Sequence, residues 1–118
     1  MADLRTLIQA SLDKAEQQRS PEAIARRHYE KRLVIVKDAL ASIARNIEIA
    51  RHNIKLSGQM LSRDAVQNDI GAYWFWLESA FNADQILREA RDTIDNFAAF
   101  YPELAHYCAA LRARIEAE

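Results

Sequence analysis

The sequence predicts an all-α protein, and three observations support that fold class. Only two glycines and two prolines occur in 118 residues, far fewer than the tight turns of a sheet protein of this length need. Apolar residues recur at intervals of three and four along most of the chain, which is the period of amphipathic helices. Half of the residues are hydrophobic and 28% are charged, so we expect one folded helical domain over residues 1–118.

Two helices are predicted on either side of Ser20-Pro21. Serine accepts hydrogen bonds from free backbone N–H groups at a helix start, and proline fits the first helical turn. The first helix therefore covers about residues 3–19, and the second covers residues 21–57 and ends at Ser57-Gly58, where glycine permits a left-handed stop. The apolar stripes of these helices are formed by Leu4, Leu7, Ile8, Leu12 and Ala15, and by Leu33, Val36, Leu40, Ile43, Ile47, Ala50 and Ile54.

A second long helix is predicted over residues 62–100. Ser62 is a good N-cap residue, and Asn68-Asp69-Ile70-Gly71 is a weak point at which the helix either breaks or continues. Tyr101-Pro102-Glu103 ends this helix and opens a short last one, which extends to about Glu116. The expected buried sides are formed by Val66, Ile70, Trp74, Leu77, Phe81, Leu87, Ile94, Phe97 and Tyr101, and by Leu104, Cys108, Leu111 and Ile115.

The helix lengths predict how these elements pack. At about 1.5 Å per residue, the two long helices each reach roughly 50 Å and the two short ones about 20–25 Å. Short connections make neighbouring helices antiparallel, so both short helices fold back against the same end of the long pair. We therefore expect an antiparallel bundle of about four helices, with a bare two-helix hairpin, residues 38–56 and 61–85, projecting at one end.

Four successive aromatic residues lie in this predicted hairpin. They point around nearly the whole helix, so a two-helix hairpin buries one or two of them and not all four. Exposed aromatic surface usually marks an interface, and a second copy packed by two-fold symmetry would cover it. The expected interface residues are Tyr73, Trp74, Phe75, Trp76, Ile49 and His52. The alternative is an aromatic cluster buried within a monomer.

The leading interpretation is a non-enzymatic protein–protein interaction module that acts as a homodimer and binds another protein. Regulators, complex subunits and phage-type inhibitors all fit that description. No motif for phosphate binding, metal coordination or covalent catalysis is present, so we expect no cofactor and no metal. Asp84, Arg88 and Asp92 are spaced as solvated ion pairs, and Cys108 as a buried structural thiol. Neither an apolar run of membrane-spanning length nor a signal peptide occurs, so we expect a cytoplasmic location.

One spacing in the second helix resembles a known catalytic signature. Arg45-Asn46 is followed by His52, seven residues after Arg45 and on the same helical face. This resembles the Arg-Asn…His signature of HEPN domains, which are dimeric helical bundles found as ribonucleases and toxins. The resemblance covers eight residues and implies metal-independent RNA cleavage across a dimer cleft, in which His52 moves protons and Arg45 stabilises the phosphate charge. In that family the motif usually begins a late helix, whereas here it lies midway along an early one. The alternative is a polar pair that is exposed or faces the dimer.

Charge is unevenly distributed, although the net charge is −1. Residues 21–57 contain eight Lys or Arg against four acids, and residues 61–118 contain five against ten. The densest basic patch is formed by Arg26, Arg27, Lys31 and Arg32, which gives a third interpretation, a nucleic-acid-binding accessory subunit that contacts phosphates. The alternative is a solvated face, or a basic helix packed beside an acidic one.

Overall fold

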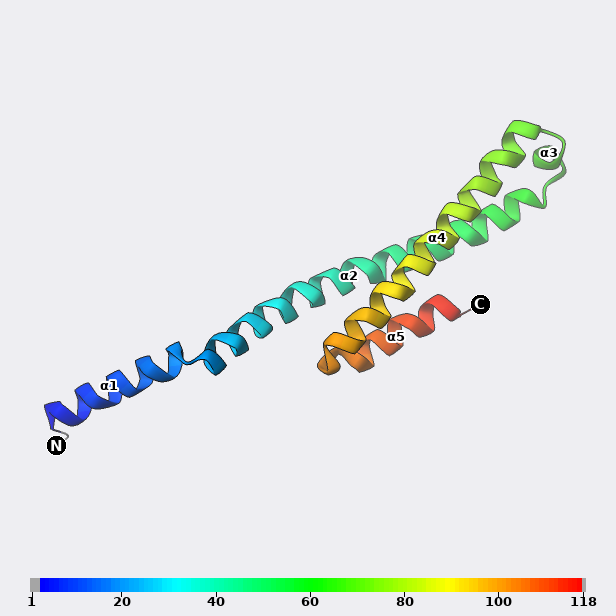
Figure 1. The fold of residues 1–118 in the computed structure, drawn as a ribbon. Coiled ribbons are helices and arrows are strands. Elements are labelled where there is room, and N and C mark those ends of the chain that lie inside the picture. Colours follow the sequence, from blue (N-terminus) through cyan, green and yellow to red (C-terminus); the bar gives the residue numbers. More distant parts are fainter. Residues whose placement is uncertain (1–2, 118) are drawn as a thin grey trace. The chain divides into compact units, whose positions relative to one another are not determined.

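The computed structural model describes residues 3–117, and every regular element in that range is helical. The elements are α1 (Leu4–Arg19), α2 (Pro21–Leu61), α3 (Asp64–Gln67), α4 (Ile70–Phe100), the 3₁₀ helix η1 (Pro102–Leu104) and α5 (Ala105–Glu116) (Figure 1). This confirms the all-α fold class. The chain divides into two compact units, residues 1–36 and 37–118, and α2 contributes residues to both.

The first unit holds α1 and the first part of α2, which meet at Ser20. The hydroxyl of Ser20 accepts a hydrogen bond from the Ala23 N–H at 3.1 Å, and Pro21 begins the new helix, as predicted. The predicted fold-back of the first helix along residues 21–37 is not observed. A single residue joins the helices, whereas a helix hairpin needs about two to five. The apolar side chains that this leaves exposed are Leu4, Leu7, Ile8 and Leu12.

The second unit contains the core, which is built from one face of each of three helices. The stripe predicted for α2 is confirmed in this unit, since Leu40, Ile47 and Ala50 are buried at spacings of seven and three. Its partners are Ala83, Leu87, Ala90 and Ile94 on α4, and Leu104, Cys108 and Leu111 on η1 and α5. Large and small side chains alternate along these faces, which allows helices to approach closely.

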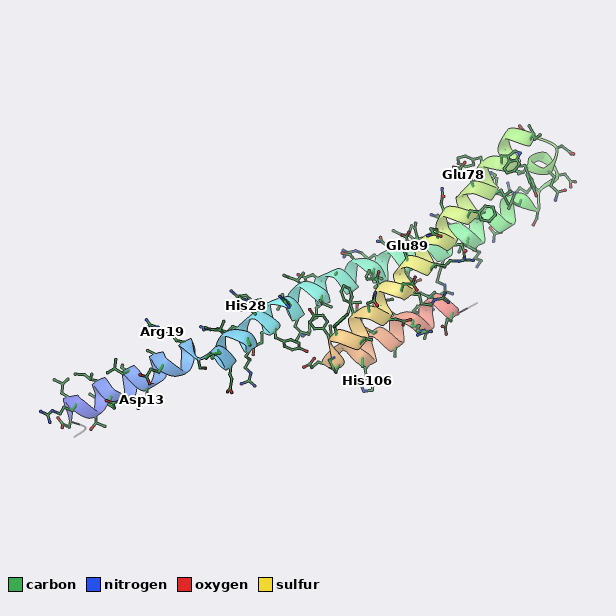
Figure 2. All side chains as sticks on the ribbon, in the orientation of Figure 1. Asp13, Arg19, His28, Glu78, Glu89 and His106 are labelled. Carbon is green, nitrogen blue, oxygen red and sulfur yellow. The ribbon has the colours of Figure 1, made fainter. Side chains whose placement is uncertain are left out.

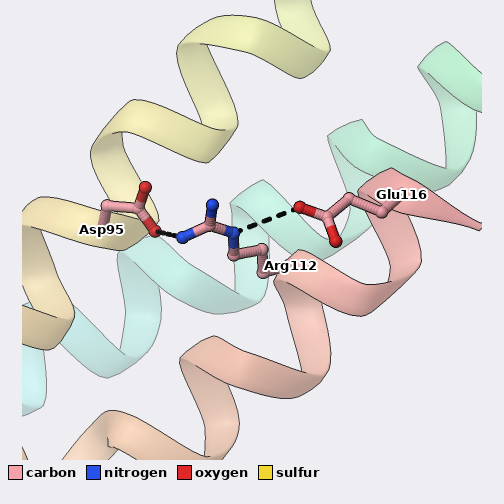
Figure 3. Close-up of polar contacts among 3 residues, drawn as sticks. All are labelled: Asp95, Arg112 and Glu116. Atoms are coloured by element: carbon pink, nitrogen blue, oxygen red, sulfur yellow. Dashed lines mark hydrogen bonds and ion pairs between the residues drawn. The ribbon is translucent and has the colours of Figure 1, made fainter.

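Helix α5 is attached to both long helices by arginine ion pairs. Arg112 binds Asp95 of α4 at 2.8 Å and also Glu116 at 3.2 Å, one turn further along α5 (Figure 3). Arg114 binds Glu48 of α2 through two parallel hydrogen bonds of 2.8 and 2.9 Å. All five side chains are about half exposed, so these pairs set the position of α5 more than they stabilise it.

The end of α2 differs from the prediction at Ser57-Gly58. The helix continues four residues further, to Leu61, and Gly58 has ordinary helical geometry with no positive φ. Ser57 is fully buried in the core, and the burial of this region keeps the helix intact. Ser62 is also not the predicted N-cap, because its hydroxyl donates back to the Gly58 carbonyl at 2.9 Å.

A break before Gly71 separates the short α3 from α4, at the weak point that the sequence indicates. Asp69 is the N-cap of α4, and its carboxylate accepts from the backbone N–H groups of Gly71 and Ala72 at 3.0 and 3.2 Å. At the other end, Tyr101 terminates α4 and Pro102 starts η1, as predicted. The resulting helix is shorter at its start than the predicted range 62–100.

The buried side predicted for this helix is correct for Val66 and for the second half of α4, and it is wrong for most of the first half of α4. Leu87 and Ile94 are buried, whereas Ile70, Trp74 and Phe81 are exposed. At about 100° per residue, these three lie on one side of α4, roughly 150° around the axis from the face that carries the core residues. The sequence therefore contains two apolar faces on α4, and only one of them is covered within the described residues.

We predict that Gly58→Ala stabilises the protein by about 0.5–1 kcal/mol, because glycine costs that much inside a helix. The added Cβ would meet nothing within 4 Å, so no packing penalty offsets the gain. Urea unfolding followed by circular dichroism measures the shift of the midpoint. A lowered midpoint would mean that Gly58 serves a contact which the chain makes with something else.

We predict that Asp69→Ala destabilises the protein by about 1 kcal/mol, because two N–H groups at the start of α4 lose their acceptor. Asp69→Asn keeps an equivalent acceptor and should retain most of the stability. Asp64→Ala is the matched control, since the start of α3 has no side-chain cap. Equal unfolding midpoints for Asp69→Ala and Asp64→Ala would contradict the capping role.

Candidate functional site

The most distinctive surface of the second unit is an uncovered apolar face on the first half of α4. Its exposed fractions are 78% for Ile70, 38% for Tyr73, 61% for Trp74 and 66% for Phe81. Leu77, which is partly buried, lies between them at the same helical angle. These five residues, called here the apolar α4 face, span about 100° of the helix surface, which is the width of a helix face that normally packs against another helix.

The charge around this face is uniformly negative. Between Ile70 and Leu87, α4 carries Glu78 and Asp84 and no lysine or arginine. Glu78 is exposed at the edge of the face, and Figure 2 labels it on this half of α4. Asp84 is held by Arg88 at 2.9 Å, one turn later, which confirms the predicted ion pair.

The structure distributes the predicted interface residues over different surfaces. Tyr73 and Trp74 belong to the apolar α4 face. Phe75 is also exposed but lies on another side of the helix, where its ring meets Trp76 edge to face at a centroid distance of 5.1 Å. Ile49 lines a shallow groove between α2 and α4 together with Ile43 and Ile86. Helical spacing separates Phe75 from Trp74 by about 100°, but it does not show which of these sides another helix covers.

His52 lines a different and larger groove, of about 630 Å³, between α2, α4 and α5. Its charged side chains are Glu48, Arg51, Lys55 and Arg114, and we call it the basic groove. Glu48 has a pKa below its ordinary value of 4.5, mainly because Arg114 donates hydrogen bonds to the carboxylate, with a further contribution from the positive charge of Arg51. Sequence reasoning missed this groove, although residues 48, 51, 52 and 55 share one helical face.

The residues of the ribonuclease interpretation are not gathered into one site by this chain. Arg45 is exposed and donates to the Ser42 hydroxyl at 3.2 Å. Asn46 lines the groove that contains Ile49, whereas His52 lines the basic groove. Arg45 and His52 are about 10 Å apart along the helix, since each residue advances it by about 1.5 Å. A shared cleft would need a second copy of the chain.

The four residues of the basic patch do not form one phosphate-binding stripe. At about 100° per residue, Arg27 and Lys31 share a side of α2, while Arg26 and Arg32 point to two other sides. All four side chains are exposed, and Arg26 is 3.8 Å from Glu30. The nucleic-acid interpretation is therefore supported by two basic residues on a common side, Arg27 and Lys31, rather than by four.

Other chemistry has little support in the described part of the chain. No group of three or more His, Cys, Asp or Glu residues there is placed to hold a metal ion. Cys108 is buried, and burial raises the pKa of its thiol, which opposes a role as a nucleophile. Among the described helices, none combines the length and apolar character that crossing a bilayer requires.

Comparison with known proteins adds no further guide to function. The chain matches no protein-family model, no curated protein and no solved structure.

We predict that the Glu48 carboxyl titrates below pH 4.5 and that Arg114→Gln moves its pKa back towards that value. A lowered folded-state pKa means that the stabilisation is present above the unfolded value and is lost as the pH falls through the folded one. Carboxyl chemical shifts followed by NMR measure the midpoint directly.

Arg112→Gln is the control for this titration, because Arg112 binds Asp95 and Glu116 instead. An unchanged Glu48 pKa in Arg114→Gln, or an equal change in Arg112→Gln, would show that the two hydrogen bonds from Arg114 do not cause the lowered pKa of Glu48.

Proposed function

We propose that this protein is a non-enzymatic protein–protein interaction module that associates with itself through the apolar α4 face. The observation that supports the proposal is the exposure of Ile70, Trp74 and Phe81 on one side of a capped, regular helix. Water-exposed apolar surface of this kind is rare on monomers, and burying a large side chain is worth about 1.5–3 kcal/mol.

A second copy is a suitable occupant because the face is complementary to itself. Trp74 and Phe81 are seven residues apart, on the same side of α4. A two-fold axis midway between them places Trp74 of one copy against the partner's Phe81, and the reverse. Two antiparallel α4 helices then bury four aromatic rings, and tryptophan is a frequent anchor at such centres.

The proposal also includes the way in which the two long helices pack against each other. Residues 38–56 and 61–85 form an antiparallel hairpin, and the first half of α4 presents its free face to the partner. Residues 43 and 49 of α2 and residue 86 of α4 line the separate shallow groove, which remains open to a further protein. A regulator, a complex subunit or an inhibitor all use such surfaces.

We predict that Trp74→Gln weakens self-association by at least about 2 kcal/mol, roughly 30-fold in the dissociation constant, the effect of removing an interface anchor. Light scattering on a sizing column over a range of concentrations measures the molar mass, and circular dichroism checks the helix content. Phe100→Gln is the matched control, because Phe100 is even more exposed on the same helix but lies outside the face.

The salt dependence gives a second, independent readout of this dimer. The Glu78 carboxylates of two copies repel each other across the interface, whereas Asp84 is paired with Arg88, so added salt should strengthen self-association. Wild-type protein that stays monomeric at every concentration and salt level would contradict the homodimer. A dimer that persists equally in Trp74→Gln and in Phe81→Gln would place its interface elsewhere.

A further inference from the structure

Among residues 3–117, the basic groove contains more positive charge than its acidic side chain neutralises. Arg51, Lys55 and Arg114 line it, against one carboxylate, that of Glu48. Arg114 engages both oxygens of Glu48 at 2.8 and 2.9 Å. Within residues 3–117, neither Arg51 nor Lys55 forms an ion pair within 4.0 Å, so two cations remain available at this surface.

One nitrogen of Arg51 shows the clearest unmet requirement. Its Nη1 atom is buried and has no hydrogen-bond acceptor among the described residues, although the side chain as a whole is only partly buried. Buried polar atoms nearly always have a partner, and leaving a charged donor without one is unfavourable. A turn of the Arg51 guanidinium towards the groove would bring this N–H group within reach of an acceptor carried by a ligand.

Apart from His52, the rest of the groove is apolar. Ile54 of α2, Leu87 of α4 and Ile115 of α5 line it, and all three are at least partly buried. The volume of about 630 Å³ lies within the range of about 300–1,000 Å³ that is typical of small-molecule sites. A ligand that fits must therefore combine a negatively charged head with an apolar body.

We propose that the basic groove binds a small organic acid, whose carboxylate pairs with Arg51 and Lys55 and whose hydrocarbon part packs on Ile54, Leu87 and Ile115. A carboxylate matches the planar guanidinium fork. A doubly charged phosphate fits less well, because the fixed carboxylate of Glu48 lines the same groove and repels it. This site does not depend on the apolar α4 face and stands if the dimer proposal fails.

Octanoate is the probe for this proposal, with octanol and octylammonium as neutral and cationic ligands of the same chain length. Isothermal titration measures affinity, and methyl NMR shifts of Ile54, Leu87 and Ile115 locate the bound chain. We expect octanoate to bind at least ten times more tightly than octanol and octylammonium not to bind.

Arg51→Gln should weaken octanoate binding at least tenfold and Lys55→Gln several-fold. Arg45→Gln is the matched control, because it removes an exposed charge from the same helix outside the groove and should leave the affinity unchanged. Lys55 is exposed, so its variant keeps the test valid if Arg51→Gln unfolds.

Three results would overturn the proposal. They are no octanoate binding at millimolar concentration, equal affinity for octanol, and equal weakening by Arg45→Gln and Lys55→Gln. Shifts confined to residues outside the groove would place any bound octanoate elsewhere and would equally reject the site.

Discussion

The packing of one face of each helix, in a core only three helices wide, is the constraint on which the rest of the second unit depends. The core residues of α4 lie between Ala83 and Ile94, and α5 has 12 residues against the 31 of α4. At about 1.5 Å per residue, α5 reaches roughly 18 Å along a helix of roughly 46 Å. The third helix is thus too short to cover the first half of α4, and the apolar residues there stay in contact with water.

That limit explains which parts of the fold could be predicted from the sequence. The stripe on α2 has one apolar face, so its period identified Leu40, Ile47 and Ala50 as core without ambiguity. Helix α4 has two, and the change from one to the other falls at the interval of six residues between Phe81 and Leu87, which the prediction passed over when it joined both into one buried side. A pattern shows that a face is apolar, but the length and position of other helices decide whether it is buried.

Local chemistry explains the helix ends that were predicted correctly and those that were not. Ser20-Pro21 and Tyr101-Pro102 act through backbone geometry and caps, which neighbouring residues determine by themselves. Gly58 is different, because glycine tolerates a helix end without requiring one, and the buried Ser57 beside it keeps α2 continuous. Tertiary packing outweighs a helix-propensity cost of about 1 kcal/mol.

The two candidate sites also differ in how far the sequence could predict them. The aromatic run was evident from the sequence, because four consecutive aromatics exceed what one helix face buries. The basic groove was not, since it needs Arg114 brought beside Glu48 from 66 residues away. The destabilising burial of the Arg51 Nη1 atom is likewise evident only from the structure. In the sequence, Arg51 is one more charge on a charged helix.

An uncompensated cation in a groove and an uncovered apolar face are both local losses in folding free energy. A chain selected for stability alone would pair Arg51 with a second acid and place polar residues at Ile70, Trp74 and Phe81. Departures from local consistency tend to occur at functional sites, where a partner or ligand supplies the missing interactions. The two departures lie on different surfaces and require different chemistry, one apolar and one anionic. The two proposed binding events are therefore separate, and occupation of the groove would stabilise the packing of α2, α4 and α5 without blocking the apolar α4 face.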